Sequence, residues 1–125
     1  MQNQSNPVNW FEISVTDLER AKKFYGAVLQ TTFQDLDMGK TKMAMFAMDP
    51  EKRGTGGSLL LADGANPSTD GTTVYFSCED CAIEAGRVEA NGGKIFFPKM
   101  SIGEFGFVAQ FYDTEGNRIG LHSNK

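Results

Sequence analysis

The feature that most constrains the fold of this chain is an internal repeat of its secondary-structure signals. A shift of about 63 positions places residues 13–15 on residues 76–78 and Asp17 on Asp80 without a gap. In each copy, an alternating β-prone segment is followed by an amphipathic helical segment and then by three further strand candidates. The repeat therefore predicts an α+β fold built from two βαβββ units.

The first unit is predicted over about residues 8–62, with its first strand at residues 8–15. Thr16 and Glu19 have the spacing of a capping box, which predicts a helix with Thr16 as its N-cap. Apolar residues recur at helical spacing over residues 18–28, so one face of this helix is expected to pack on a sheet. The remaining strands of the unit are predicted at residues 32–36, 43–48 and 58–62.

The second unit is predicted over about residues 72–123 and follows a linker, residues 63–71, that is rich in turn formers. Its first strand is predicted at residues 72–78, and its helix at residues 80–90. The turn at residues 91–93 should end this helix because it contains two glycines. The remaining strands are predicted at residues 94–98, 105–112 and 117–122.

The composition is that of one domain, residues 1–125, and it argues against two classes of partner. The formal net charge is −4, and Lys and Arg are scattered among acidic residues, so the chain has no basic stripe for nucleic acid. No apolar run approaches the roughly 20 residues needed to span a bilayer. The polar residues 1–5 lack the charged and apolar regions of a signal peptide. We therefore expect a cytoplasmic protein that binds neither nucleic acid nor membrane.

Cys78 and Cys81 are the only two cysteines, and their spacing is that of a redox pair or of half a zinc site. A zinc site needs about four ligands, and the sequence offers no second such pair to complete one. We favour the alternative, a structural role at a strand end and in the first turn of a helix.

Three stretches of the chain are similar to landmarks of a known superfamily. Residues 11–25 combine a strand, an Asp and a helix that carries Phe24 and Tyr25. Residues 91–93 form an Asn-Gly-Gly turn, and residues 111–119 read FYDTEGNRI before the last strand. On these grounds the chain resembles the vicinal-oxygen-chelate superfamily of glyoxalases, extradiol dioxygenases and bleomycin-resistance proteins. The resemblance implies that the two units curve their sheets into a cup, whose concave wall holds a divalent metal in the enzymes.

The metal-ligand positions that the resemblance implies are occupied here by residues that suit no metal. The first-strand position falls on Trp10, its counterpart in the second unit on Thr73, and the last-strand position on Gly120. The fourth-strand position falls on Leu59 or Leu60. The chain also contains one histidine, whereas both the glyoxalase-like set and the two-His-one-carboxylate triad need at least two. We therefore predict no metal and no other cofactor, with a divalent metal at a shifted site as the alternative.

The same strands predict what else lines the cup. Because strand side chains alternate, residues two apart from the ligand positions share their face of the sheet. The predicted lining is mostly aromatic and hydroxyl-bearing, with one acid and one imidazole, as in many small-molecule sites. It consists of Trp10, Glu12, Ser14, Thr73, Tyr75, Ser77, Gly120 and His122. The predicted partner is therefore a small-molecule ligand.

Two residues of this lining are candidate catalytic groups. Glu12 stands in an otherwise apolar strand and could act as a general base, while His122 could hold or relay its proton. The alternatives are a Glu12 that is exposed or structurally hydrogen-bonded, and a His122 that is solvated or bonded to a backbone carbonyl.

These observations leave three hypotheses for function. The first, implied by the likeness to bleomycin-resistance proteins, is metal-independent binding or sequestration of a small molecule by a homodimer. Trp10 and Tyr75 would stack on a planar or cationic ligand, and Glu12 would supply charge. The second is a lyase or isomerase of glyoxalase type, metal-free through Glu12 and His122 or with a relocated metal. The third, a role in assembly alone, would need a filled cup and an exposed apolar patch elsewhere.

Overall fold

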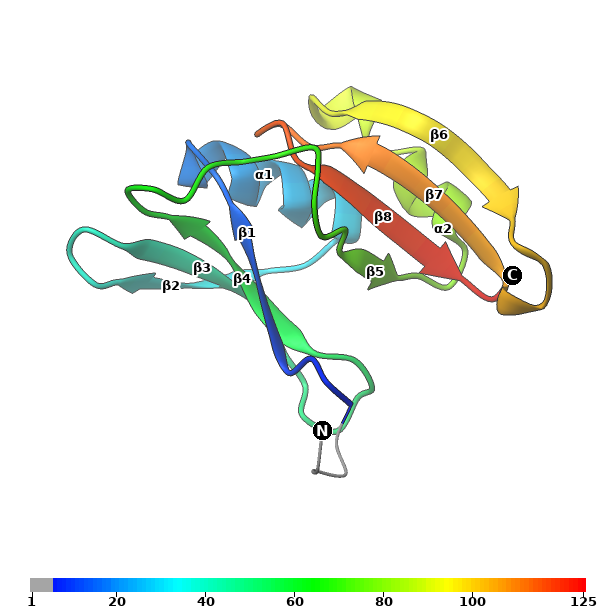
Figure 1. Ribbon diagram of the computed structural model, residues 1–125, viewed down its shortest axis with the longest axis horizontal. Coiled ribbons are helices and arrows are strands. Elements are labelled where there is room, and N and C mark those ends of the chain that lie inside the picture. The colour runs from blue at the N-terminus through cyan, green and yellow to red at the C-terminus, as the bar shows by residue number, and fades with distance from the viewer. Residues whose placement is uncertain (1–5) are drawn as a thin grey trace.

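The computed structural model describes residues 6–125 and contains two four-stranded sheets, each with its own helix (Figure 1). The polar residues 1–5, on which the expected lack of a signal peptide rests, lie outside the described residues. Among residues 6–125, no helix has the length and apolar character needed to cross a membrane.

The first unit consists of β1 (Trp10–Ser14), α1 (Leu18–Leu29), β2 (Phe33–Asp37), β3 (Lys42–Phe46) and β4 (Gly56–Leu61). Its sheet has the strand order β1-β4-β3-β2. β1 pairs with β4 in parallel, and the other neighbours are antiparallel. The crossover through α1 makes the parallel pair possible, because parallel strands cannot be joined by a tight hairpin.

The second unit repeats this arrangement with β5 (Tyr75–Ser77), α2 (Cys81–Ala85), β6 (Lys94–Ser101), β7 (Phe107–Tyr112) and β8 (Arg118–Ser123). Its strand order is β5-β8-β7-β6, with β5 parallel to β8. The predicted α+β class with two βαβββ units is therefore confirmed. Two short 3-10 helices are added to the repeat, at Glu89–Asn91 and Gly103–Phe105.

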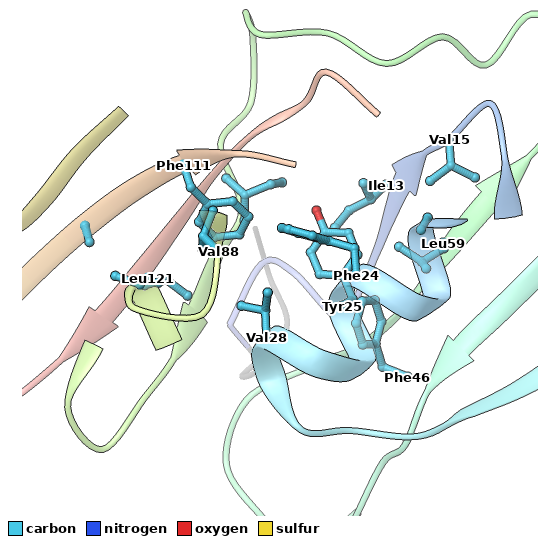
Figure 2. Packing of buried hydrophobic residues seen from close by; sticks show 14 of the residues in the cluster. Ile13, Val15, Phe24, Tyr25, Val28, Phe46, Leu59, Val88, Phe111 and Leu121 are labelled. Carbon is cyan, nitrogen blue, oxygen red and sulfur yellow. The ribbon is translucent and has the colours of Figure 1, made fainter. Parts of the chain in front are cut away.

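Helix α1 is the centre of a core that both units share. Figure 2 shows its buried side chains between residues of the first sheet and residues of the second. The ring of Phe24 lies 5.8 Å from that of Phe111 in β7, and the ring of Tyr25 lies 5.8 Å from that of Phe46 in β3. Both α1 rings are at most 1% exposed, and burial of such a side chain stabilises a fold by about 1.5–3 kcal/mol. Much of this stabilisation depends on both units being folded together.

The first turn of α1 differs from the expected capping box. The N-cap is Asp17, whose carboxylate accepts a hydrogen bond of 3.0 Å from the backbone N–H of Arg20. Thr16 instead donates its backbone N–H and its hydroxyl to Glu115, at 2.8 and 3.0 Å. The predicted N-cap at Thr16 is therefore wrong. In a capping box, Glu19 would accept the hydrogen bond from the backbone N–H of Thr16, but here Glu115 from the other unit accepts it.

The second unit also corrects several predicted boundaries. The helix ends at Ala85 with Gly86 as its C-cap, and the rest of the segment predicted as helical forms turns and a 3-10 helix. The first strand of this unit has three residues, so Thr73 precedes β5 and does not belong to it. β6 in contrast extends to Ser101, past Pro98, which an edge strand tolerates because one row of its backbone groups has no strand partner.

The turn between β7 and β8 fastens the second unit to the first. The buried Asp113 accepts a 2.6 Å hydrogen bond from the hydroxyl of Tyr25. Asn117 donates its side-chain amide to the backbone oxygen of Ser14 at 2.8 Å. Glu115, whose side chain is 0% exposed, also pairs with Arg20 of α1 at 2.7 Å. We call Asp113, Glu115 and Asn117 the inter-unit clamp.

Candidate functional site

Each sheet has one face against the helices and an open face turned away from them. In β1, Ile13 is 4% exposed and belongs to the core, so the alternating residues Trp10, Glu12 and Ser14 lie on the open face. The parallel register with β4 places Gly56, Ser58 and Leu60 directly beside these three residues. The predicted alternation along the first strand is thus present in the first sheet.

Trp10 and Met48 occupy the space above Gly56. A Cβ atom on Gly56 would lie 2.1 Å from the sulfur of Met48 and 3.3 Å from the ring of Trp10. Any side chain at this position would displace one of them, since real Cβ atoms do not come so close to other heavy atoms. The open face of the first sheet therefore has an aromatic ring and a thioether where Trp10 adjoins β4.

Ser58 is an unusual polar residue beside this aromatic. It is 0% exposed, and the register places it between Glu12 of β1 and Met45 of β3. Within residues 6–125, its hydroxyl oxygen has no hydrogen-bond partner. An unpaired buried hydroxyl costs free energy, so Ser58 is a locally unfavourable polar group between Glu12 and Met45.

The open face of the second sheet repeats the pairing of a ring with a glycine. A Cβ atom on Gly120 would lie 2.3 Å from the ring of Tyr75, so this ring covers the position where the superfamily resemblance placed a metal-binding glutamate. The side-chain amide of Gln110 donates a 2.6 Å hydrogen bond to the oxygen of Tyr75 and fixes the ring. Tyr75 is still 46% exposed, which leaves one face of its ring free for a ligand.

The two candidate catalytic residues lie on different sheets. His122 in β8 makes a 2.7 Å hydrogen bond through Nε2 with the backbone oxygen of Phe105. Glu12 in β1 is exposed, and within residues 6–125 its carboxylate has no hydrogen bond that joins it to His122. Ser77 adjoins His122 in the register of β5 and β8. The catalytic roles of Glu12 and His122 stay predictions.

The implied metal-ligand positions lie in different parts of the fold. Leu59 is 0% exposed in the core, whereas Leu60 lies on the open face beside Ser14. Trp10 and Gly120 lie on the open faces of different sheets. In the part of the chain that the structure describes, no three side chains of His, Cys, Asp or Glu come together to hold a metal ion.

The Cys78 and Cys81 pair has the environment of structural thiols. Cys81 is 0% exposed in the first turn of α2. Burial, followed by the negative charge of Glu84, raises the pKa of the Cys78 thiol to about 12. Since the thiolate is the reactive form of cysteine, Cys78 is a poor nucleophile at neutral pH.

Sequence reasoning missed a cavity between the two units, although Ser77, a predicted cavity residue, is among the residues that line it. Its volume is about 660 Å³, within the usual range for small-molecule sites. One wall is formed by β1, the end of α1 and the loop at residues 47–55, and the other by β5 and α2. We call it the inter-unit cavity. No local sequence signal indicates it, because its walls come from segments far apart in the chain.

The sequence and the fold are both similar to those of known proteins. Residues 8–121 match the family model of the Glyoxalase/Bleomycin resistance protein/Dioxygenase superfamily. The structure is similar to glyoxalase I from Zea mays, with a TM-score of 0.73 and 25% identity over 94% of this chain and 46% of that one. A search of the curated proteins finds no significant match.

Two further solved structures have the fold of the whole chain. A glyoxylase/bleomycin resistance protein/dioxygenase domain from Frankia sp. has a TM-score of 0.75 and 17% identity, covering 98% of this chain and 100% of that one. A glyoxalase/bleomycin resistance protein from Albidiferax ferrireducens has a TM-score of 0.67 and 21% identity, covering 96% and 100%. This chain thus spans about half the length of the Zea mays enzyme and the whole of the other two.

Proposed function

Because the chain belongs to the glyoxalase/bleomycin resistance protein/dioxygenase superfamily, we propose that it binds and sequesters a small molecule without a metal. The observation that carries this proposal is the ring of Tyr75, which lies over Gly120, the position to which the superfamily resemblance assigns a metal-binding glutamate. Trp10 beside Gly56 is the corresponding ring of the first sheet. Aromatic rings at or over the implied ligand positions favour stacking on a ligand over polarising it.

The chemistry around the two rings favours a planar cation. Stacking on Trp10 and Tyr75 requires a flat π-surface, and a positive charge on it adds an attraction to the ring faces. Glu12 is exposed two residues from Trp10 on the same face and supplies a negative charge.

We propose further that the protein acts as a homodimer, in which the open face of one chain covers that of another. The second sheet has large apolar side chains at or near its open face, with Phe96 47%, Met100 49% and Phe105 69% exposed. Contact with a second chain would remove this apolar surface from water, which is the main driving force for association. The measurement is the mass in solution across a range of protein concentrations, and a monomer at every concentration would refute the dimer.

A fluorescence titration with two matched probes tests the ligand class. We expect the planar cation 9-aminoacridine to quench Trp10, the only tryptophan, and to bind more tightly than neutral acridine at pH 7.5. Glu12→Gln should weaken 9-aminoacridine about 5-fold, since one exposed charge contributes on the order of 1 kcal/mol, and should leave acridine unchanged.

Glu104→Gln is the control variant because it removes an exposed carboxylate from the loop that follows β6. Equal affinities for the two probes, or equal losses in the Glu12 and Glu104 variants, would contradict the role of Glu12.

Metal analysis separates this proposal from the alternative of a relocated metal site. We expect the purified protein to take up no stoichiometric zinc, nickel, manganese or iron after incubation and desalting. Stoichiometric metal that is lost in Glu12→Ala or His122→Ala would instead favour the glyoxalase-type enzyme.

A further inference from the structure

The inter-unit cavity has an aromatic base made by both units. The rings of Phe11, Phe46 and Phe76 form a triangle, with centroid separations of 5.7 Å for Phe11 to Phe46, 5.7 Å for Phe11 to Phe76 and 5.5 Å for Phe46 to Phe76. All three residues line the cavity. They lie on the helix side of their strands, so this base is separate from Trp10 and Tyr75 on the open faces. An apolar or aromatic body of a ligand would pack against the three rings.

Two cations stand on the wall that belongs to the first unit. Lys52 and Arg53 lie in the loop before β4, line the cavity and are exposed. Neither forms a salt bridge with any residue from 6 to 125. The neighbouring Asp49 also lines the cavity, but its carboxylate accepts the backbone N–H of Glu51 and so serves the loop itself. Lys52 and Arg53 are therefore available to an anionic group.

The wall that belongs to the second unit carries a carboxylate with an unused oxygen. Glu84 of α2 lines the cavity, and its carboxylate interacts with the neighbouring Cys78 thiol, while its Oε1 is buried without a hydrogen-bond partner of good geometry within residues 6–125. A carboxylate oxygen removed from water needs a donor, because an unpaired charged group costs more than an unpaired neutral one. The cavity thus has a site for an anion on one wall and a site for a hydrogen-bond donor on the other.

From this arrangement we infer that the inter-unit cavity, which adjoins the open faces at Met48, Gly56 and Ser77, is a second ligand site for an amphipathic aromatic compound with an N–H donor and an anionic group. The aromatic body packs on Phe11, Phe46 and Phe76, the donor meets Glu84, and the anion meets Lys52 and Arg53. A purely hydrophobic compound would leave the oxygen of Glu84 unpaired, and a simple anion would leave the three rings uncovered.

Fluorescence of 6-anilinonaphthalene-2-sulfonate tests this inference, because the probe carries an anilino N–H and a sulfonate at opposite ends of a naphthalene ring. We expect saturable binding of one probe molecule per chain. N-phenyl-2-naphthylamine, which lacks the sulfonate, and naphthalene-2-sulfonate, which lacks the anilino group, should both bind at least about 5-fold more weakly.

Variants locate the bound probe. Ala47 is exposed and lines the cavity, so Ala47→Trp should fill the space and raise the Kd at least about 5-fold. Ala90→Trp, at an exposed position outside the cavity lining, should leave the Kd unchanged. Tyr75→Ala removes a ring from the open face and should also leave it unchanged, which separates this site from the one under Proposed function.

Charge variants test the two polar walls. The double variant Lys52→Gln, Arg53→Gln should weaken the sulfonate probe at least about 5-fold and leave N-phenyl-2-naphthylamine unaffected. Lys23→Gln, Lys40→Gln removes the same charge at exposed positions outside the cavity lining and is the matched control. Glu84→Met, which removes the acceptor oxygens at similar side-chain length, should weaken both N–H probes and leave naphthalene-2-sulfonate unaffected.

Three results would overturn the inference. The first is the absence of saturable binding by 6-anilinonaphthalene-2-sulfonate. The second is binding that Tyr75→Ala abolishes and Ala47→Trp leaves intact, which would place the probe on the open face. The third is an equal loss of affinity for the sulfonate probe in Lys52→Gln, Arg53→Gln and in the control Lys23→Gln, Lys40→Gln. Lys52 and Arg53 would then act only through the overall charge of the protein.

Discussion

At the scale of single residues, Gly93 shows how closely the two units approach each other. A Cβ atom at this position would lie 2.7 Å from the backbone oxygen of Tyr112, 2.8 Å from the ring of Phe24 and 2.8 Å from Val88. The neighbouring Gly92 has φ = +98°, a conformation that favours glycine. The Asn-Gly-Gly turn at residues 91–93 therefore has two physical causes, a left-handed backbone at Gly92 and the close contact of Gly93 with α1 and β7.

We expect Gly93→Ala to destabilise the protein by about 1–3 kcal/mol, because the methyl group overpacks a core that includes backbone atoms. Gly26→Ala in α1 is the control. Its Cβ would meet no atom closer than 3.5 Å, so the gain in helix propensity should stabilise the protein by about 0.4–1 kcal/mol. Urea unfolding of both variants measures these changes. An unchanged free energy of unfolding in Gly93→Ala would show that the core can relax around the methyl group.

The residues of the candidate sites differ in how far the sequence can predict them. The alternation of β1 is a local property, so the common face of Trp10, Glu12 and Ser14 follows from spacing alone. The unpaired oxygens of Ser58 and Glu84 depend on which distant groups surround them, and no local pattern encodes that.

At the scale of elements, the start of α1 depends on a carboxylate from the turn between β7 and β8. Burial has the largest single effect on the pKa of Glu115 and would raise it. Hydrogen bonds from the guanidinium of Arg20 and from the backbone N–H groups of Thr16 and Asp17 together outweigh burial. The pKa therefore falls from its ordinary value of 4.5 to about 2. The ionised Glu115 consequently stabilises the folded protein.

The lowered pKa of Glu115 gives the stability a defined pH dependence. Its contribution is complete above about pH 4.5 and is lost as the pH falls toward about 2. It amounts to roughly 1–3 kcal/mol, because Arg20 is half-exposed and solvent screens the pair. We expect Glu115→Gln to lower the free energy of unfolding at pH 7 and to flatten its decline below pH 4.5.

Urea titrations between pH 3 and 7 measure this dependence. Glu104→Gln, which changes an exposed carboxylate in the loop after β6, should keep the slope of the wild-type protein. If the free energy of unfolding fell equally steeply with pH in the wild-type protein and in Glu115→Gln, another carboxylate would be responsible for the loss of stability below pH 4.5.

The contact between Thr16 and Glu115 explains why the start of α1 could not be predicted. The order and type of the strands and helices follow from periodicity, which is local and repeated in both units. The choice between Thr16 and Asp17 as N-cap depends on Glu115, which lies 99 residues after Thr16 in the chain. A capping rule that considers neighbouring residues cannot include such a partner.

At the scale of the whole molecule, the shared core makes the two units one folding entity. The buried cluster extends from Ile13 and Leu59 in the first unit through α1 to Phe111 and Leu121 in the second. The clamp adds buried hydrogen bonds between them, including that of Tyr25 with Asp113. Separation of the units would expose both the apolar face of α1 and the polar groups of the clamp.

We therefore expect both units to unfold at one denaturant concentration. Trp10 is the only tryptophan and reports on the first unit, while Cys78 and Cys81 are the only thiols and report on the second. Tryptophan fluorescence and pulsed thiol labelling should give coincident urea transitions at the same protein concentration. Separate midpoints would mean that one unit stays folded after the other has opened.

The inter-unit clamp can form only late in the synthesis of the chain. Tyr25 and its partner Asp113 are separated by 88 positions, so at about 5–20 residues per second the ribosome needs roughly 4–18 s to supply the partner. During that interval, the apolar side of α1 that contacts the second sheet has no native surface to cover it. The nascent first unit is therefore an expected client of chaperones that shield apolar helices, and slow codons between the units would lengthen its exposure.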